Sequence, residues 1–258
     1  MKQLPVLLLF GLTFFLLLSG CDRGGGTIRH GNLSYDVTEV FGAGTPALAL
    51  AKAAGRGDVK EINRLVADGA DVNVVGKHDI TPLWWALWAK NFTGFQTLLD
   101  KSGNPNVKRT EQYSIMYLSA DMDNSKFLAA ALKHGGNPNL LDGQSSWPPL
   151  YPAILHGYEE NIDLLLTAKA DVNFQDLISG QTLPMLAMGA RADYKLIYKL
   201  FQHGADLTLK DRFGNTLADT IALRSINASN NDDPWRAKVL EILKNKGISA
   251  SKSINKDY

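Results

Sequence analysis

The pentapeptide Gly69-Ala70-Asp71-Val72-Asn73 is the clearest copy of a motif that recurs along the chain. Every copy has an Asp or Asn two residues before its end. The copies end at Asn73, Asn106, Asn139, Asn173 and Thr208, with spacings of 33, 33, 34 and 35 residues. A spacing held this closely indicates a repeat architecture, in which each unit is one supersecondary element that buries its apolar face against its neighbours.

A second motif opens the repeats 25 residues before these ends and is clearest in Thr81-Pro82-Leu83-Trp84. Threonine before proline predicts a helix start, because the hydroxyl accepts a free backbone N–H and proline is tolerated in the first turn. Glycine after the following helix suits a left-handed cap, and the recurring Asp or Asn suits a turn in which the side chain bonds its own backbone. The first unit has Leu48 at the opening position, so we expect it to lack the Thr-Pro start. The other openings stand at Ser114, at Pro148 and, displaced by one inserted residue, at Thr182.

Both motifs resemble the ankyrin repeat, which opens with T-P-L-H-x-A and ends with G-A-D-V-N. The resemblance covers about residues 48–247 and implies an all-α solenoid of paired antiparallel helices, with about six units. Residues 33–47 are expected to cap the first unit, and the sixth unit, interrupted by the polar insertion 227–233, to cap the last. The family's histidine is absent, so its inter-repeat hydrogen bonds must be replaced. Its positions hold Trp84, Tyr117, Tyr151 and Met185.

The N-terminus predicts export and lipidation. Residues 1–20 combine Lys2 with an apolar stretch, as in a signal peptide, and Leu18-Ser19-Gly20-Cys21 resembles the bacterial lipobox. The resemblance implies lipidation of Cys21, with an ordinary secretory signal or an uncleaved anchor as the alternatives. Asp22, by resemblance to enterobacterial lipoproteins, favours the inner membrane. We therefore expect a lipid-anchored protein on the periplasmic face of a bacterial membrane.

The rest of the chain divides by composition. Residues 21–32 are polar and glycine-rich, which predicts a flexible tether, residues 33–247 form the repeat domain, and residues 248–258 are a polar tail. Lys and Arg total 27 against 26 Asp and Glu, which gives no reason to expect a nucleic-acid partner. The single cysteine excludes a disulfide within the chain.

No motif for catalysis, nucleotide binding or zinc binding is present in the sequence. The five histidines stand singly, without a second histidine at metal-ligand spacing. We therefore predict no catalytic residue, no metal and no cofactor, and a protein that is not an enzyme.

Aromatic residues suggest a partner-binding surface. Trp85 and Trp88 lie one turn apart on the first helix of the second unit, where the resemblance places a concave groove. Trp, Tyr and Arg carry most binding hot spots. Burial in the core is the alternative for Trp85, Trp88 and Trp147, and Trp84 is assigned to the core. The predicted partner-binding residues are Lys77, His78, Trp85, Trp88, Arg109, Tyr113 and Trp147.

The expected function is binding of a folded protein by a chain that is monomeric when unbound. Ankyrin-like lipoproteins of this design resemble immunity proteins that neutralise phospholipase effectors of type VI secretion, and a membrane-tethered inhibitor would be concentrated where a lipase attacks. The alternative is an envelope scaffold or helper that stabilises a resident periplasmic enzyme.

Overall fold

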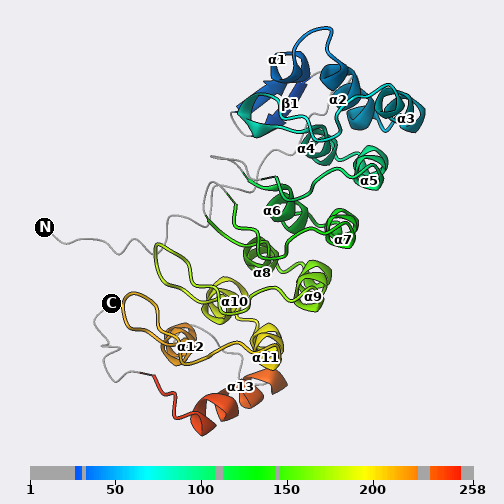
Figure 1. Cartoon of the computed structure of the whole chain (residues 1–258). Helices are drawn as coiled ribbons and strands as arrows, with labels where there is room; N and C mark the ends of the chain where they lie inside the picture. Colours follow the sequence, from blue (N-terminus) through cyan, green and yellow to red (C-terminus); the bar gives the residue numbers. More distant parts are fainter. Residues whose placement is uncertain (1–26, 31–32, 108–112, 143–145, 226–232, 251–258) are drawn as a thin grey trace, which may run out of the picture. The chain divides into compact units, whose positions relative to one another are not determined.

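The computed structural model of the chain describes residues 27–30, 33–107, 113–142, 146–225 and 233–250. The predicted signal peptide, Cys21, Asp22 and Arg109 lie outside these residues, as do 226–232 of the insertion and 251–258 of the tail. The chain divides into two units, Met1–Gly103 and Asn104–Tyr258, and each is described by itself. Apart from one short hairpin and one isolated bridge, the described residues form helices and loops (Figure 1), so the all-α prediction is confirmed.

The first unit begins with a hairpin instead of an open tether. Strands β1 (Thr27–His30) and β2 (Leu33–Asp36) pair antiparallel, so residues 27–30 of the predicted 21–32 tether form a strand. Helix α1 (Val37–Phe41) follows at once, because the Asp36 carboxylate caps it by accepting the backbone N–H of Thr38 at 2.8 Å. The apolar side of α1 is buried, and α1 packs on α2 (Pro46–Arg56).

The first repeat does have a Thr-Pro opening, contrary to expectation. Thr45 caps α2, with its hydroxyl accepting the Leu48 N–H at 3.1 Å, and Pro46 is the first helical residue. The opening was expected at Leu48 because the repeat length was taken as constant. Helix α2 has 11 residues, whereas its counterpart α4 (Pro82–Trp88) has 7. The extra turn moves the opening upstream.

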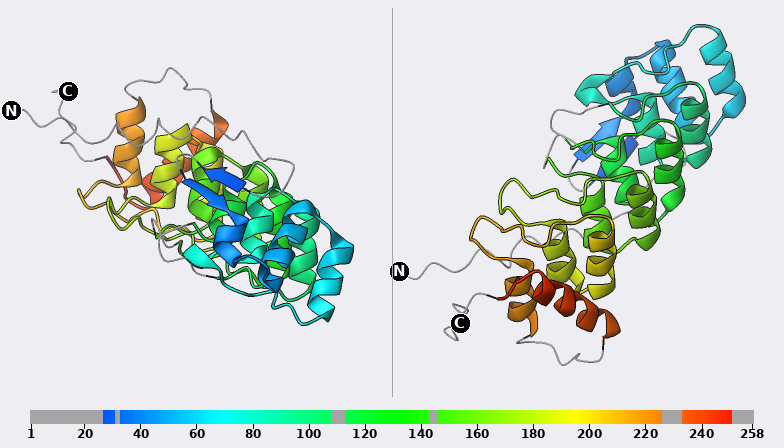
Figure 2. Two further views of the ribbon diagram at one scale, coloured as in Figure 1. Left: turned by 90° about the horizontal axis from the view of Figure 1, so that it is seen from above. Right: turned by 60° about the horizontal axis from the view of Figure 1, so that its bottom comes forward.

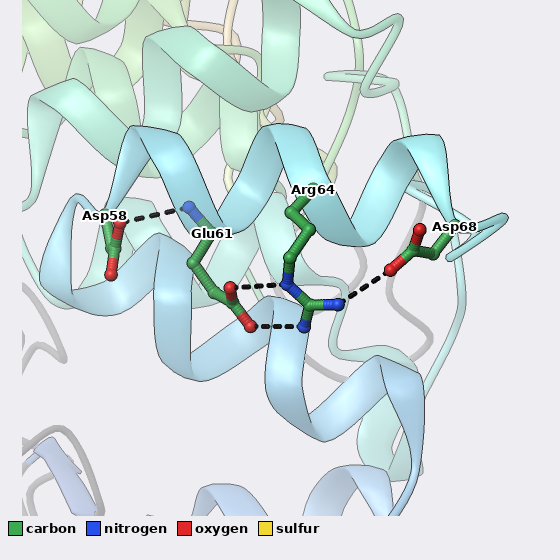
Figure 3. Close-up of polar contacts among 4 residues, drawn as sticks. All are labelled: Asp58, Glu61, Arg64 and Asp68. Carbon is green, nitrogen blue, oxygen red and sulfur yellow. Dashed lines mark hydrogen bonds and ion pairs between the residues drawn. The ribbon is translucent and has the colours of Figure 1, made fainter.

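Two helix pairs follow within the first unit. Helix α2 pairs with α3 (Val59–Ala67), and α4, which follows the short 3-10 helix η2 (Lys77–Asp79), pairs with α5 (Phe92–Asp100). Helix α3 buries Ile62 and Leu65 and turns a charged face outward. On that face Arg64 donates to both Glu61 oxygens at 2.8 and 2.7 Å and to Asp68 at 2.7 Å (Figure 3). Helix α3 thus has one buried apolar side and one charged side, as expected for a helix at the surface of a repeat.

The second unit continues the same plan. Its helices are α6 (Ile115–Ala120), α7 (Ser125–Lys133), α8 (Leu150–His156), α9 (Glu159–Thr167), α10 (Leu183–Arg191), α11 (Tyr194–Gln202), α12 (Leu217–Ser225) and α13 (Pro234–Asn245). Helix α8 contacts both α6 and α10, and α7 contacts α9, so first helices stack on first helices (Figures 1 and 2). Helices α12 and α13 end the stack by packing on α10 and α11. None of the described helices in either unit is long and apolar enough to span a bilayer.

The repeated Asp and Asn residues make the turns that the sequence predicts. In every copy this side chain accepts the N–H two residues ahead, at 2.8 to 2.9 Å. The Asn that ends a copy also forms hydrogen bonds to the following repeat. Asn173, for example, accepts the Asp206 N–H at 2.8 Å and donates to the Gly204 carbonyl at 3.2 Å, which joins one repeat to the next.

Candidate protein-binding site

Three pairs of stacked aromatic rings mark the openings of successive repeats. Their members are four residues apart, and in the first pair, where both residues lie in α4, this spacing places the side chains on one face of the helix. Their ring centroids are 4.2 to 4.8 Å apart and the planes lie within 13° of parallel. The position where the ankyrin pattern has histidine is held by Trp84, the first member of the first pair, and by Tyr117 and Tyr151, the second members of the other two. The pairs are Trp84 with Trp88, Tyr113 with Tyr117, and Trp147 with Tyr151.

The first pair belongs to an aromatic cluster in the first unit. Trp84 is 2% exposed and forms the base, while Trp88 is half-buried and offers part of its ring to solvent. Tyr35, from strand β2, meets Trp84 edge-on at 6.0 Å and His78 at 5.5 Å. Lys77 and His78 are exposed beside this cluster on η2. The hairpin contribution of Tyr35 was not foreseen, because the residues before 33 were read as a tether.

Trp85 is a core residue and not a partner-binding residue. Its side chain is 1% exposed and lies against Phe41, with ring centroids 6.4 Å apart. The indole also occupies the space beside Gly55 of α2, where an added Cβ would lie 3.0 Å from the Trp85 Nε1. One helical step turns a side chain by about 100°, so Trp85 faces α2 whereas Trp88 stacks on Trp84. The assignment of Trp84 to the core agrees with its burial.

In the second unit Tyr113 and Trp147 are both half-buried, each on its own stacked partner. The Trp147 Nε1–H donates to the Asp176 carboxylate at 3.1 Å, and the Trp147 backbone N–H donates to Asp142 at 3.3 Å. Both carboxylates are buried. The indole is therefore held by Asp176 and by stacking on Tyr151, the Trp147 backbone is held by Asp142, and the residue remains partly open to solvent.

Tyr117 and Tyr151, the second members of the two stacked pairs of this unit, have raised pKa values and are neutral at physiological pH. Burial, followed by the nearby charge of Asp176, raises the pKa of Tyr151 to about 12. Burial, followed mainly by Asp121, also raises the pKa of Tyr117. In Asp176, burial alone would raise the pKa, but the hydrogen bonds from Ser179, Trp147 and the Ile178 backbone outweigh it and lower the pKa. Neutral aromatic faces backed by carboxylates give this surface a negative electrostatic character, which favours a cationic group over the rings.

The predicted binding residues thus fall into separate groups. The structure brings Lys77, His78 and Trp88 together in the first unit, and it places Tyr113 and Trp147 in the second, where Tyr117 and Tyr151 join them. Arg109 lies outside the described residues. Within the described residues no three His, Cys, Asp or Glu side chains gather as a metal site. Nothing in this geometry suggests chemistry on a bound substrate, whereas amphipathic rings held half-open are typical of binding surfaces.

Comparison with known proteins supports the repeat fold. No family model matches the chain. Protein PhlB of Serratia liquefaciens is 29% identical over 140 residues, and a putative ankyrin repeat protein of Rickettsia felis is 27% identical over 139 residues. The matched segment spans 61% of the first relative and 35% of the second.

Solved structures match over most of this chain. The ankyrin-repeat protein EF0377 is similar with a TM-score of 0.63 and 24% identity, over 76% of this chain and 97% of its own. The ankyrin repeat domain of Bcl-3, a member of the IkappaB family, is similar with a TM-score of 0.64 and 19% identity, over 80% of this chain and 88% of its own. With the repeat motifs and stacked helix pairs, these likenesses show that the chain has the ankyrin-repeat fold.

Proposed function

We propose that this chain is a lipid-anchored binding protein of the bacterial envelope that captures and neutralises a phospholipase effector delivered by type VI secretion. The observation that carries the binding role is that Tyr113 and Trp147 of the second unit are half-buried, each stacked on the ring four residues further along the chain. Ankyrin repeats are suited to protein–protein interaction because they present one row of equivalent positions from successive units. The lipobox-like Leu18-Ser19-Gly20-Cys21 supports the anchor and the periplasmic face.

The aromatic residues of the second unit define what a partner should offer. Tyr113 and Trp147 expose ring surface, and Asp142 and Asp176 lie buried behind Trp147. An Arg side chain fits such a surface, because its planar cation stacks on aromatic faces and its charge is favoured by the carboxylates. Neutralisation would follow if the bound surface covers the cleft or the membrane-facing side of the lipase.

The test measures phospholipase activity on phospholipid vesicles while the purified, lipidated chain is added. The enzyme is a purified phospholipase effector of type VI secretion. We expect stoichiometric loss of activity, which Trp147→Ala and Tyr113→Ala weaken. Glu160→Ala, an exposed change in the first turn of α9, is the matched control. Full activity in the presence of excess folded protein contradicts the proposal, and a gain in enzyme activity or lifetime indicates the helper function.

A further inference from the structure

Two neighbouring loops of the second unit expose large apolar side chains. Leu177 and Ile178, in the loop before α10, are 58% and 79% exposed, and Phe213, in the loop before α12, is 78% exposed. We call these three side chains the apolar tip. Exposed apolar side chains are common singly, but adjacent ones on rigid loops mark an interaction site.

Each of these loops is folded tightly by its own backbone. In the first, the Asp176 N–H donates to the Gln181 carbonyl at 2.9 Å and the Gly180 N–H donates to the Asp176 carbonyl at 2.7 Å. In the second, the Asp211 N–H donates to the Asn215 carbonyl at 2.9 Å. The apolar side chains are thus held outward by formed turns, so docking costs little conformational entropy.

The two loops are also bonded to each other. The Arg212 N–H donates to the Ser179 carbonyl at 2.9 Å, and its guanidinium donates to the Leu177 carbonyl. The Gln175 side chain donates to the Lys210 carbonyl at 2.9 Å. Gly180, with φ +71°, allows this approach, because an added Cβ would lie 2.8 Å from the Arg212 nitrogen. The apolar tip is therefore one element built from two repeats.

Charge is distributed unevenly around the apolar tip. The carboxylates turn inward: Asp176 is buried on Ser179 and Trp147, and Asp211 accepts the backbone N–H groups of Phe213 and Asn215 at 2.9 and 2.8 Å. Lys210 and Arg212, in contrast, are exposed. The outward surface of this element is therefore apolar and cationic.

We propose that the apolar tip inserts into the headgroup region of a bilayer that contains anionic phospholipid. Leu, Ile and Phe side chains gain free energy on leaving water, and Lys and Arg are attracted to anionic headgroups. A protein hot spot usually offers Trp, Tyr or Arg with a polar group for orientation, and leucine is under-represented there. The apolar tip lacks such groups at its three apolar positions, so it suits a fluid, non-directional partner. This proposal does not depend on phospholipase neutralisation.

The test places an environment-sensitive fluorophore at the apolar tip in the full chain. Ile178→Cys is labelled with nitrobenzoxadiazole and reconstituted into vesicles of phosphatidylethanolamine and phosphatidylglycerol. We expect a several-fold rise in emission, quenching by lipids with spin-labelled acyl chains, and protection from aqueous iodide. Phosphatidylcholine vesicles should give a weaker effect, as should Phe213→Ser added to the labelled chain.

Two controls keep the result specific. Glu160→Cys carries the same label on exposed α9, and the parent chain, whose one cysteine is Cys21, gives the background. Because the measurement reports contact at one position, it is unaffected by attachment through a lipid anchor. Iodide access at position 178 in vesicles overturns the proposal. Equal shielding of the label at position 160 also overturns it. Shielding at position 178 that appears only when a phospholipase is added overturns it as well, because that result would assign the apolar tip to a protein partner.

Discussion

The indole of Trp147 and the carboxylate of Asp176, 29 residues apart in sequence, are joined by a 3.1 Å hydrogen bond that links one repeat to the loop of the next. Trp147 is half-buried and belongs to the candidate binding surface, whereas Asp176 lies at the base of the loop that carries Leu177 and Ile178. One buried carboxylate therefore supports two different surface features of the second unit.

Asp176→Asn should destabilise the protein by about 1–3 kcal/mol, since one carboxylate oxygen accepts both the N–H and the hydroxyl of Ser179. An amide NH₂ in place of that oxygen is itself a donor, so it would face the N–H and the hydroxyl of Ser179 without accepting from either. Urea unfolding of the variant at neutral pH measures the loss. Asp123→Asn, the same charge change at an exposed residue, is the control and should shift the midpoint little.

The acid dependence of stability should change with the same substitution. The pKa of Asp176 is lowered below 3.8 in the folded state, because its hydrogen bonds outweigh the effect of burial. Its contribution is therefore fully present above the unfolded pKa and is lost as the pH falls through the lower folded pKa. In urea titrations from neutral to strongly acidic pH, the variant should lose less stability below about pH 4 than the parent. An identical acid slope in both proteins would argue against this role.

Gly94→Ala should be severely destabilising, whereas Gly189→Ala should not. A Cβ at Gly94 would lie 1.9 Å from the Ala54 carbonyl oxygen, a backbone atom of α2 that cannot move without disturbing the helix pair. At Gly189 the nearest atom is the Gln181 amide at 3.6 Å, an ordinary contact. We expect a loss of at least about 3 kcal/mol for the first, and for the second no loss or a gain of up to about 1 kcal/mol from helix propensity. Chemical unfolding of the two variants distinguishes these outcomes.

The sequence predicts the repeats, their turns and their helices because these depend on short-range chemistry. The recurring Asp or Asn forms its turn by accepting the backbone N–H two residues ahead, and Thr81 caps its helix by accepting the backbone N–H of Trp84. The prediction was wrong at Leu48, where a longer α2 moved the opening to Thr45, and at residues 27–30, where a hairpin stands in the expected tether. Both errors concern segment length, which the repeat motif does not fix.

The candidate site was less predictable, because side-chain direction depends on packing. Trp85 and Trp88 both fit an aromatic stripe, and only the contacts of Trp85 with Phe41 and beside Gly55 assign it to the core. Tyr117 and Tyr151 were visible as substitutes for the missing histidine, but their stacking on Tyr113 and Trp147 was not foreseen. The apolar tip was missed because exposure of Leu177 and Phe213 follows from loop pairing across repeats.

Substitution of the two tryptophans should separate core from surface. Trp85→Ala should cost about 3–5 kcal/mol, as expected for removal of a fully buried aromatic side chain. Trp88→Ala removes a half-buried ring stacked on Trp84 and should cost about 1–2 kcal/mol. Guanidinium unfolding followed by circular dichroism measures both. Equal losses would place Trp88 in the core with Trp85 and remove it from the candidate surface.

Substitution by aspartate should destabilise the protein at the asparagines that end the motif copies. The same substitution two residues earlier in a copy should be tolerated. Asn173 accepts the Asp206 N–H at 2.8 Å and donates to the Gly204 carbonyl at 3.2 Å, so Asn173→Asp keeps the first bond and sets a carboxylate oxygen against a carbonyl. We expect a loss of about 1–2 kcal/mol in urea unfolding at neutral pH. Asn137→Asp is the matched control, because that side chain only accepts the Asn139 N–H at 2.9 Å in the same turn, as Asp171 does in the next repeat for Asn173. Comparable losses in the two variants would mean that added negative charge, and not the lost donor, causes the effect.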